Sequence, residues 1–393
     1  MQINLPRQVK LVTARFTMDG SEALEGQLAQ TCRQVLAGVQ AVISPTELEG
    51  LVLGGGYGRG QGGVLRTATG DWPYNDLEFY VFVRGNILMG ERRYRAALQA
   101  LGERLTPAAG LHVEFKVYSV EKLRRSPVSM FTYDLVAGHK IIFGDKELFR
   151  GCEHHLAAAQ IPASEATRLL FNRCSGLLLA KDFLSHAMLT AEQSDFIGRN
   201  LAKTQLAFGD AVLAALGHYH WDCRERNARL RELKLLQPPP GLVDVRHHHG
   251  CGIEFKLHPH RARNSHAGYA VQIAEMSALG RQLWLWLESR RLNRGFSSAR
   301  DYALAGLSKC PETAAWRNGA LNLRAFGLRA LWSRNAFRYP RERLFNALCL
   351  LLWDDPALNE PALVRKLKTE LHTTAGQWPD LIRAYQNIWQ NYG

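Results

Sequence analysis

The spacing of apolar positions divides the chain into a first part that contains strands and a longer part made of helices. Apolar side chains recur at helical spacing over residues 21–43, and the dipeptide Ser44-Pro45 ends the run. A second helical pattern covers residues 90–105. Short runs rich in β-branched and aromatic residues predict three strands, at residues 51–53, 77–83 and 111–120. Strands interrupted by helices indicate a small mixed α/β sheet within residues 21–150.

Strand signals almost vanish after residue 150. Helices are predicted at residues 165–189, 196–216, 269–291, 314–332, 341–353 and 362–392, the last with an interruption near Pro379. Residues 237–264 are rich in Pro, Gly and His and predict an irregular connector. The expected fold class is therefore α+β, with a mixed-sheet domain over 21–150, a helical domain over 151–236 and a C-terminal helical region over 265–393.

The composition is that of a globular protein and is compatible with an anionic ligand. At 393 residues the chain is expected to form two or three domains, on a prior of roughly 150 residues per domain. Its net charge of +13 favours nucleotides, phosphorylated metabolites or nucleic acid, although arginine-rich helices explain the same excess without a functional cause. The cysteines are scattered and never spaced as CxxC, and the longest apolar run, residues 347–353, is far shorter than the ~18 residues of a membrane span. We therefore expect a cytoplasmic protein without a membrane partner.

Residues 51–64, LVLGGGYGRGQGGV, combine a short strand with a glycine-rich turn. Such a turn exposes consecutive backbone N–H groups, and the absence of side chains lets a phosphate approach closely. The run is not a Walker P-loop, because no GK[ST] follows, and it does not match the dinucleotide-binding pattern GxGxxG. Taken alone, it indicates phosphate binding only weakly.

Two acidic residues follow in the second predicted strand, YNDLEFYVFV. Asp76 and Glu78 lie two residues apart, which places both carboxylates on one face of the sheet and favours a cation such as Mg²⁺ between them. Glu114, in LHVEFKVYS, offers a third carboxylate on a strand that can lie alongside, with Val113 and Phe115 facing a helix. Three carboxylates beside a phosphate-holding loop are the apparatus of metal-assisted attack at phosphorus. The alternative is an ordinary glycine turn with surface acids on an edge strand.

The succession of GGYGRG, NDLEFYVFV and VEFKV resembles the nucleotidyltransferase superfamily, which includes the aminoglycoside and the minimal nucleotidyltransferases. In that family a GSxxRG-like loop is followed by a D-x-D strand and a later single acid. Residues 132–149, TYDLVAGHKIIFGDKELF, look like the segment that closes such domains, where a polar turn leads to a strand ending in glycine. The resemblance covers roughly residues 45–150 and extends loosely to the helices that follow.

The resemblance implies roles for individual residues in binding a nucleoside triphosphate and its metal, Mg²⁺ or Mn²⁺. The implied nucleotide contacts are Gly55, Gly56 and Arg59, and the implied metal ligands and catalytic acids are Asp76, Glu78 and Glu114. Of these, Arg59 would orient the loop or meet a phosphate, and Glu114 would complete the metal site or take the proton of the acceptor hydroxyl. The chain departs from the family pattern in having Gly56 in place of serine, Glu78 in place of aspartate and the extra stretch LRTATGDWPY before Asp76.

Two lysines of the helical half are further candidate nucleotide contacts. Lys181 falls on the apolar stripe of its helix, where an ammonium group must meet an anion or extend past Leu177 to solvent. Lys203 shares one face of the next helix with Arg199 and Asp210, an arrangement that fits a cleft wall and also a solvated charged face.

Two other clusters carry alternatives of their own. The histidines of residues 247–266, with Cys251, do not match a zinc-binding spacing, so a basic loop near the active site is favoured over a metal site. Residues 316–343 are basic and aromatic enough to stack bases of RNA, but their helical spacing favours a basic helix packed through one face.

The sequence as a whole predicts a metal-dependent nucleotidyltransferase. The enzyme would move a nucleoside monophosphate from a triphosphate to a hydroxyl of a small-molecule acceptor and release pyrophosphate. Two alternatives stay open: a toxin-like or RNA-modifying relative, whose RNA binding would depend strongly on salt, and a catalytically inactive nucleotide-binding sensor.

Overall fold

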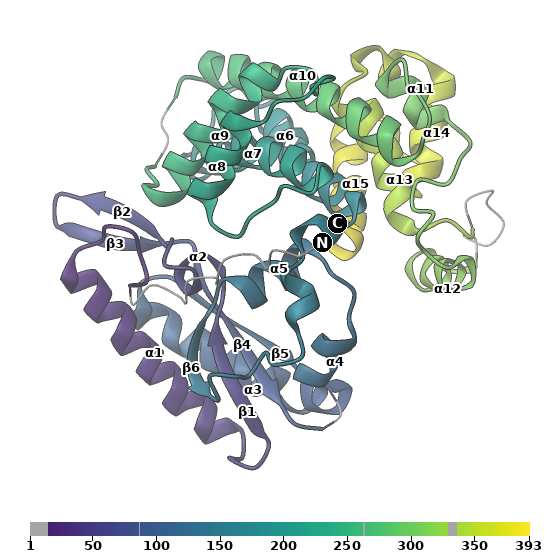
Figure 1. Ribbon diagram of the computed structural model, residues 1–393. Coiled ribbons are helices and arrows are strands. Elements are labelled where there is room, and N and C mark those ends of the chain that lie inside the picture. Colours follow the sequence, from purple (N-terminus) through teal and green to yellow (C-terminus); the bar gives the residue numbers. More distant parts are fainter. Residues whose placement is uncertain (1–14, 86, 262–263, 329–335) are drawn as a thin grey trace, which may run out of the picture. The chain divides into compact units, whose positions relative to one another are not determined.

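The computed structural model describes residues 15–85, 87–261, 264–328 and 336–393, and these form two compact units. The first unit comprises the described residues of Met1–Pro162, Leu216–Glu232 and Ile253–His260. The second comprises those of Ala163–Ala215, Leu233–Gly252 and Arg261–Gly393, so the segments 151–236 and 265–393 both contribute to it. Figure 1 shows the helices and strands of both units.

A mixed sheet of four strands forms the centre of the first unit (Figure 1). Its strands are β1 (Leu48–Leu53), β4 (Asp76–Val83), β5 (His112–Tyr118) and β6 (Lys140–Gly144), in the spatial order β5-β4-β1-β6. Strands β4 and β5 are parallel, whereas β1 runs antiparallel to both β4 and β6. The three predicted strands are confirmed, and so is the strand that ends in glycine, which is β6. The α+β class predicted from the sequence is confirmed as well.

Helices cover both faces of this sheet because the strands are apolar on both sides. The first core joins one face of the sheet to α1 (Glu22–Val42), which Ser21 caps, and to α3 (Ile87–Ala109). The second core lies on the other face, around Tyr80 and Phe82, and includes α4 (Val120–Arg125) and α5 (Met130–Ala137). Asp76 and Glu78 therefore share the face of Tyr80, at the beginning of β4, where the second core has not yet closed over the strand.

The stretch between the glycine turn and Asp76 forms a hairpin that the sequence pattern did not reveal. Its strands are β2 (Gly63–Thr67) and β3 (Gly70–Tyr74), paired antiparallel. The glycine turn itself begins with one helical turn, α2 (Gly55–Gly58). The other short elements of the first unit are the 3₁₀ turns η1 (Glu153–Leu156) and η2 (Ala158–Gln160) and the helix α8 (Cys223–Glu232).

The second unit consists of helices in the part of it that the structure describes. Besides most of α9 (Leu242–Leu257), they are α6 (Ala163–Phe183), α7 (Ala191–Ala215), α10 (His266–Arg291), α11 (Ala299–Leu304), α12 (Ala315–Phe326), α13 (Pro340–Leu352), η4 (Asp355–Asn359), α14 (Pro361–Leu371) and α15 (Trp378–Tyr392). The predicted helices are present, and the predicted interruption of the last one separates α14 from α15. The end of the helix predicted at 314–332 lies outside the described residues. No helix in the described ranges has the length and apolarity needed to cross a bilayer.

The prediction of an irregular connector is wrong over α9 (Leu242–Leu257), which is a regular helix. Prolines and glycines normally break helices, and this segment is rich in both. However, the prolines lie outside α9, since residues 238–240 precede it and Pro259 follows it. Gly252 lies within the helix, where a Cβ would come within 2.4 Å of the Leu206 backbone nitrogen. The glycine thus allows close packing on α7 and does not end the helix.

Candidate functional site

The glycine turn lies directly against the acidic strand β4. Gly54 donates its backbone N–H to the carbonyl oxygen of Glu78 at 2.9 Å, and a Cβ at Gly54 would lie 2.4 Å from the Tyr80 ring. Gly55 has a φ of +60°, and a Cβ there would lie 3.4 Å from the carboxyl carbon of Glu78. The turn therefore uses glycine for close approach and for a left-handed backbone, and its backbone borders the Glu78 carboxylate.

Tyr57 fixes the turn to the hairpin that precedes Asp76. Its buried hydroxyl accepts the backbone N–H of Tyr74 at 2.7 Å and lies 3.0 Å from the carbonyl oxygens of both Gly63 and Tyr74. Burial raises the pKa of Tyr57, so the hydroxyl stays protonated and able to donate. Asn75 then turns the chain through a left-handed conformation, φ 78°, and β4 begins at Asp76. The hairpin thus sets the position of the first acid.

The second and third acids are neighbours across two parallel strands. Glu78 on β4 is the register partner of Glu114 on β5, and both carboxylates are partly exposed. Lys116 lies on the same face and places its ammonium 3.3 Å from Glu114 and 3.9 Å from Glu78. The Tyr80 hydroxyl also donates to Glu78, at 2.5 Å, and burial followed by the Glu78 charge raises its pKa. The Lys116 ammonium therefore lies close to both carboxylates and partly neutralises their charge.

The carboxylates of the site suit a hard divalent cation, but the Lys116 ammonium beside them competes with it. Carboxylate oxygens are the ligands that Mg²⁺ prefers, and Asp76 and Glu78 share a face of β4 beside Glu114. Among the described residues, however, no three acidic, histidine or cysteine side chains are grouped closely enough to form a metal site. A metal held by these acids would be repelled by the Lys116 ammonium beside them.

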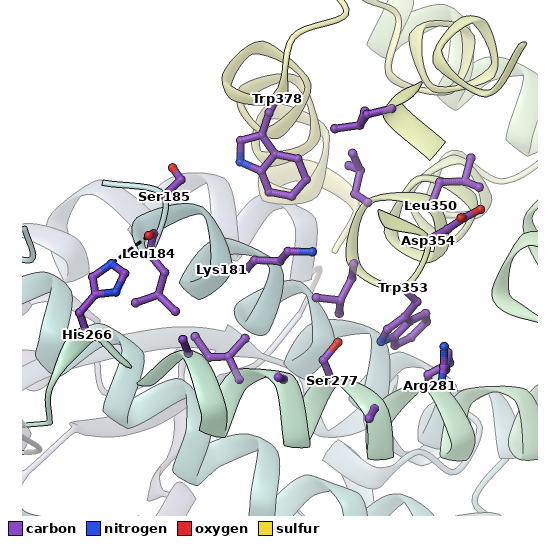
Figure 2. A pocket seen from close by; sticks show the side chains of 17 residues that line it. Lys181, Leu184, Ser185, His266, Ser277, Arg281, Leu350, Trp353, Asp354 and Trp378 are labelled. Atoms are coloured by element: carbon purple, nitrogen blue, oxygen red, sulfur yellow. Dashed lines mark hydrogen bonds between the residues drawn. The ribbon is translucent and has the colours of Figure 1, made fainter. Parts of the chain in front are cut away.

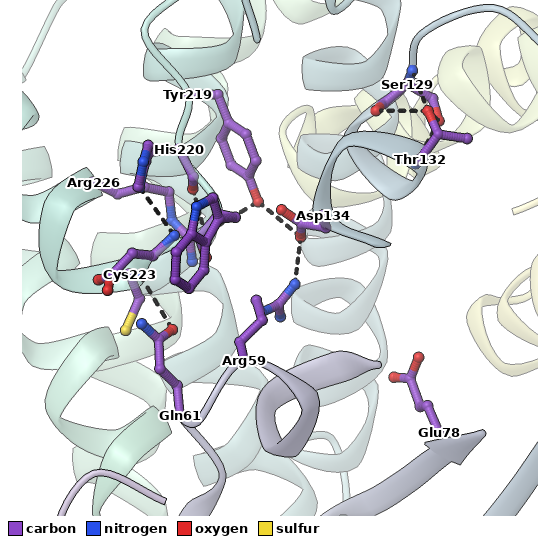
Figure 3. Close-up of polar contacts among 12 residues, drawn as sticks. Arg59, Gln61, Glu78, Ser129, Thr132, Asp134, Tyr219, His220, Cys223 and Arg226 are labelled. Atoms are coloured by element: carbon purple, nitrogen blue, oxygen red, sulfur yellow. Dashed lines mark hydrogen bonds and ion pairs between the residues drawn. The ribbon is translucent and has the colours of Figure 1, made fainter. Parts of the chain in front are cut away.

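A network of cationic side chains adjoins the other end of the glycine turn (Figure 3). Arg59 donates to the Asp134 carboxylate at 2.8 Å, and its stem packs so closely on Gly138 that a Cβ there would lie 2.6 Å away. The Tyr219 hydroxyl donates to the same carboxylate oxygen at 3.2 Å, and Arg226 donates to that hydroxyl at 3.1 Å. Asp134 thus fixes the direction of the Arg59 guanidinium, and the role of Arg59 in orienting the turn or meeting a phosphate stays a prediction.

Lys256 adds a third positive charge to this network from the end of α9. Its ammonium donates to the carbonyl oxygen of Gln61 at 3.2 Å, and the Gln61 side chain accepts the backbone N–H of Cys223 at 3.3 Å. Burial, together with the charges of Arg59 and Arg226, lowers the pKa of Lys256 to about 8. Three cations therefore gather around one carboxylate at the glycine turn, an arrangement that favours an anion nearby.

The structure brings together the predicted residues of the first unit. Gly55 lies against Glu78, and Glu78 lies beside Glu114; Gly56 and Arg59 belong to the same turn. Sequence reasoning missed four residues of the site, which are Lys116, Asp134, Arg226 and Lys256. Only Lys116 carried a local signal, because it lies two residues after Glu114 in a strand and must share its face.

The two predicted lysines of the helical half belong to the second unit. Lys181 is half-buried near the end of α6 and lies 5.6 Å from the centre of the Trp378 ring, and Lys203 is half-buried on α7. Asp210, on the same face as Lys203, is buried and accepts from His249 at 3.0 Å. Their role in binding a nucleotide stays a prediction.

The histidines of the histidine-rich segment lie on α9, just after it and at the beginning of α10, and their side chains have separate partners. His248 lies 3.3 Å from Glu275, His249 bonds Asp210, and His258 lies 3.5 Å from Asp19. These contacts do not converge on one point, and the described residues contain no histidine-based metal group. The predicted basic loop is wrong where α9 is helical.

Comparisons with known proteins give no independent evidence. No family model matches the chain, and neither a curated protein nor a solved structure is detectably similar to it. The function has to be argued from the site itself.

Proposed function

We propose that the first unit binds a nucleoside triphosphate with Mg²⁺ and transfers its nucleoside monophosphate to a hydroxyl group. The observation that carries this proposal is that the glycine turn and the acids lie together. The Gly55 backbone lies against the Glu78 carboxylate. Glu114 is the register partner of Glu78 on the neighbouring strand, and Asp76 lies two residues before Glu78. A side-chain-free turn and several carboxylates on one sheet face are the parts needed to hold a phosphate chain and its cation.

The roles follow from the positions of the groups. Asp76 and Glu78 would hold the metal, which when bound neutralises the charge that develops on the phosphate oxygens. The Gly55 and Gly56 backbone would border the leaving phosphates, with Arg59 directed by Asp134. Glu114 accepts the proton of the acceptor hydroxyl, whose oxygen bonds the α-phosphorus while the bond from that phosphorus to pyrophosphate breaks.

The acceptor is proposed to be a small molecule. Glu114 lines a cavity of about 540 Å³ between β5 and α3, within the usual size range of pockets for small ligands. Charges of both signs, including Glu91, Arg95 and Lys122, surround it. A polyanion such as RNA would meet carboxylates as well as cations there, which favours a smaller polar acceptor.

Thermal unfolding with each ribonucleoside triphosphate, with and without Mg²⁺, tests the proposal. A ligand at 100 times its Kd stabilises the native state by about 2.7 kcal/mol, and we expect that shift only with Mg²⁺ and not in Asp76→Asn. Glu121→Gln is the matched control, because Glu121 is an exposed acid of the same unit that pairs with Arg125. Transfer of label from an α-³²P triphosphate to acceptor extracts then measures catalysis. A wild-type protein that no triphosphate stabilises refutes the proposal.

One observation favours a second candidate, a nucleotide-binding sensor without catalysis. Lys116 already supplies a positive charge to Glu78 and Glu114, so a triphosphate is able to bind without a divalent metal. A sensor would show triphosphate binding that is independent of Mg²⁺ and survives Asp76→Asn, with no labelled product in either form.

A further inference from the structure

A cavity of about 690 Å³ lies among four helical segments of the second unit (Figure 2). Its wall consists of the end of α6, the part of α10 from His266 to Arg281, the end of α13 with the following turn, and the beginning of α15. This volume lies within the range of roughly 300–1,000 Å³ that is typical of small-ligand pockets. All of its lining residues belong to the second unit, so it is separate from the acids of β4 and β5.

The cavity exists because α10 presents small side chains toward it. Ala270, Ala274 and Ala278 recur at a spacing of four residues and therefore form one stripe of the helix, and all three line the cavity. Aliphatic side chains such as Leu184 and Leu350 and the indole of Trp378 form the apolar wall. That indole is held in place, since its Nε1 donates to Asp182 at 2.7 Å. An apolar ligand body would thus meet a preformed surface.

Three hydrogen-bond donors gather on one side of this apolar space (Figure 2). Ser277 and Arg281 are one turn apart on α10, and Trp353 follows α13. The Trp353 Nε1 is buried and has no hydrogen-bond acceptor among the residues that the structure describes. Arg281 likewise makes no hydrogen bond or ion pair with described residues, although it lines the cavity. A buried donor without an acceptor is costly, so an acceptor that a ligand supplies to the Trp353 Nε1 would relieve that cost.

The charges around the cavity favour an anionic ligand, because two basic side chains, Lys181 and Arg281, line it. Asp354 also lines the space, but both of its carboxylate oxygens accept from Arg300, at 2.6 and 2.9 Å. The acidic side chain of this cavity is therefore already paired with an arginine that does not line it. A planar carboxylate matches the paired donors of one guanidinium, whereas a phosphate dianion so close to Asp354 would be repelled more strongly.

We propose that this cavity is a binding site for a small carboxylic acid with an aromatic or branched apolar body. The carboxylate would accept from Arg281, Ser277 and the Trp353 indole, and the apolar body would lie along the alanine stripe against Trp378. The site does not depend on the function proposed for the first unit.

The test uses 1-naphthaleneacetate as the carboxylate probe, its uncharged amide as the matched ligand, and inorganic phosphate. Binding is followed on the full-length protein by the indole N–H resonances of ¹⁵N-tryptophan, with the Trp353 signal assigned from Trp353→Phe. We expect the carboxylate to shift the Trp353 signal in a saturable manner and to bind at least tenfold more tightly than the amide. Arg281→Gln should weaken carboxylate binding at least tenfold and leave amide binding unchanged.

Two further variants separate the site from general effects. Arg290→Gln changes an exposed arginine of the same helix that lies over Trp286, and it should bind the carboxylate like the wild type. Ala274→Trp fills the space from its floor and should abolish binding of both organic probes. Asp76→Asn should have no effect, so failure of the triphosphate proposal would not affect this result.

Several outcomes would overturn the proposal. They are the absence of any Trp353 shift at carboxylate concentrations up to about 5 mM, equal affinity for the carboxylate and the amide, and phosphate binding as tight as carboxylate binding. Because Arg281 is exposed, Arg281→Gln is expected to fold, and unchanged carboxylate affinity in that variant would also refute the assignment.

Discussion

Replacing Lys116 with methionine is expected to tighten divalent-cation binding at the acids of β4 and β5. The ammonium lies 3.9 Å from Glu78 and 3.3 Å from Glu114, where it competes with any metal that those carboxylates hold. Methionine keeps most of the apolar stem and removes the charge. The ion pairs are partly exposed, so their loss should cost little stability, about 0.2–1 kcal/mol each.

The size of the effect on the metal follows from Coulomb's law. A divalent cation bound to Glu78 would lie roughly 5 Å from the ammonium, where the repulsion is about 1.7 kcal/mol in water. This energy corresponds to a factor of roughly 15 in affinity, because about 1.4 kcal/mol is tenfold. Screening over a Debye length of about 8 Å reduces it to roughly fivefold in physiological salt. The Lys116→Met protein should therefore bind metal about five to 15 times more tightly, with the larger gain at low salt.

Titration with Mn²⁺, followed by the electron paramagnetic resonance of the free ion, measures this affinity directly. Lys146→Met is the control, since Lys146 is an exposed lysine in the turn after β6. Adding Glu78→Gln to Lys116→Met should remove the gain. If Lys116→Met binds Mn²⁺ within a factor of two of the wild type at low salt, the acids do not hold a metal and the reasoning fails.

Three other perturbations test the packing and charge of the first unit. Gly54→Ala should destabilise it by about 1–3 kcal/mol in urea unfolding, because the new Cβ would lie 2.4 Å from Tyr80, whereas Gly26→Ala has no neighbour within 4 Å and should not destabilise it. Asp134→Asn should cost about 2 kcal/mol, since it leaves a largely buried guanidinium without its carboxylate. The pKa of Lys256 is about 8 in the folded chain against an ordinary 10.5, so the unfolded chain binds more protons between these values and stability should rise with pH there. Urea unfolding at intervals across this range should show a smaller rise in Lys256→Met.

Each of these expectations has a result that would contradict it. Equal stability of the Gly54 and Gly26 variants would mean that the turn accommodates a side chain. Asp145→Asn changes an exposed acid of the same unit and is the control for Asp134→Asn. If both variants lose the same free energy of unfolding, the ion pair between Asp134 and Arg59 does not stabilise the unit. A pH profile that is the same in the wild type and in Lys256→Met would show that Lys256 keeps an ordinary pKa.

The part of the site that follows from strand periodicity was predictable from the sequence. Asp76 and Glu78 share a face because side chains alternate along a strand, and Glu114 follows because β5 has the same alternation and lies parallel to β4. Lys116 obeys this rule too and was open to prediction, since it is two residues from Glu114. Alternation alone does not show which strands are neighbours, and the pairing of Glu78 with Glu114 needed the structure.

The network of Arg59, Asp134, Arg226 and Lys256 could not be predicted from local sequence patterns. Arg59, Asp134, Arg226 and Lys256 come from four segments separated by tens of residues, and no spacing rule connects them. The error at α9 has a different origin. Local propensity predicts that glycine breaks a helix, but close packing of α9 on α7 requires a glycine there, so tertiary contact overrides local propensity.

Lys116 also provides the means to decide between an enzyme and a sensor. If the protein is an enzyme, Lys116 pairs with Glu78 only while no metal or nucleotide is bound. The Lys116→Met variant should then keep its turnover and reach half of its maximal rate at a lower Mg²⁺ concentration. In a sensor the lysine replaces the metal permanently, so the same variant should lose metal-independent triphosphate binding and form no product at any Mg²⁺ concentration. The two functions therefore predict opposite responses to the loss of one charge that lies between Glu78 and Glu114.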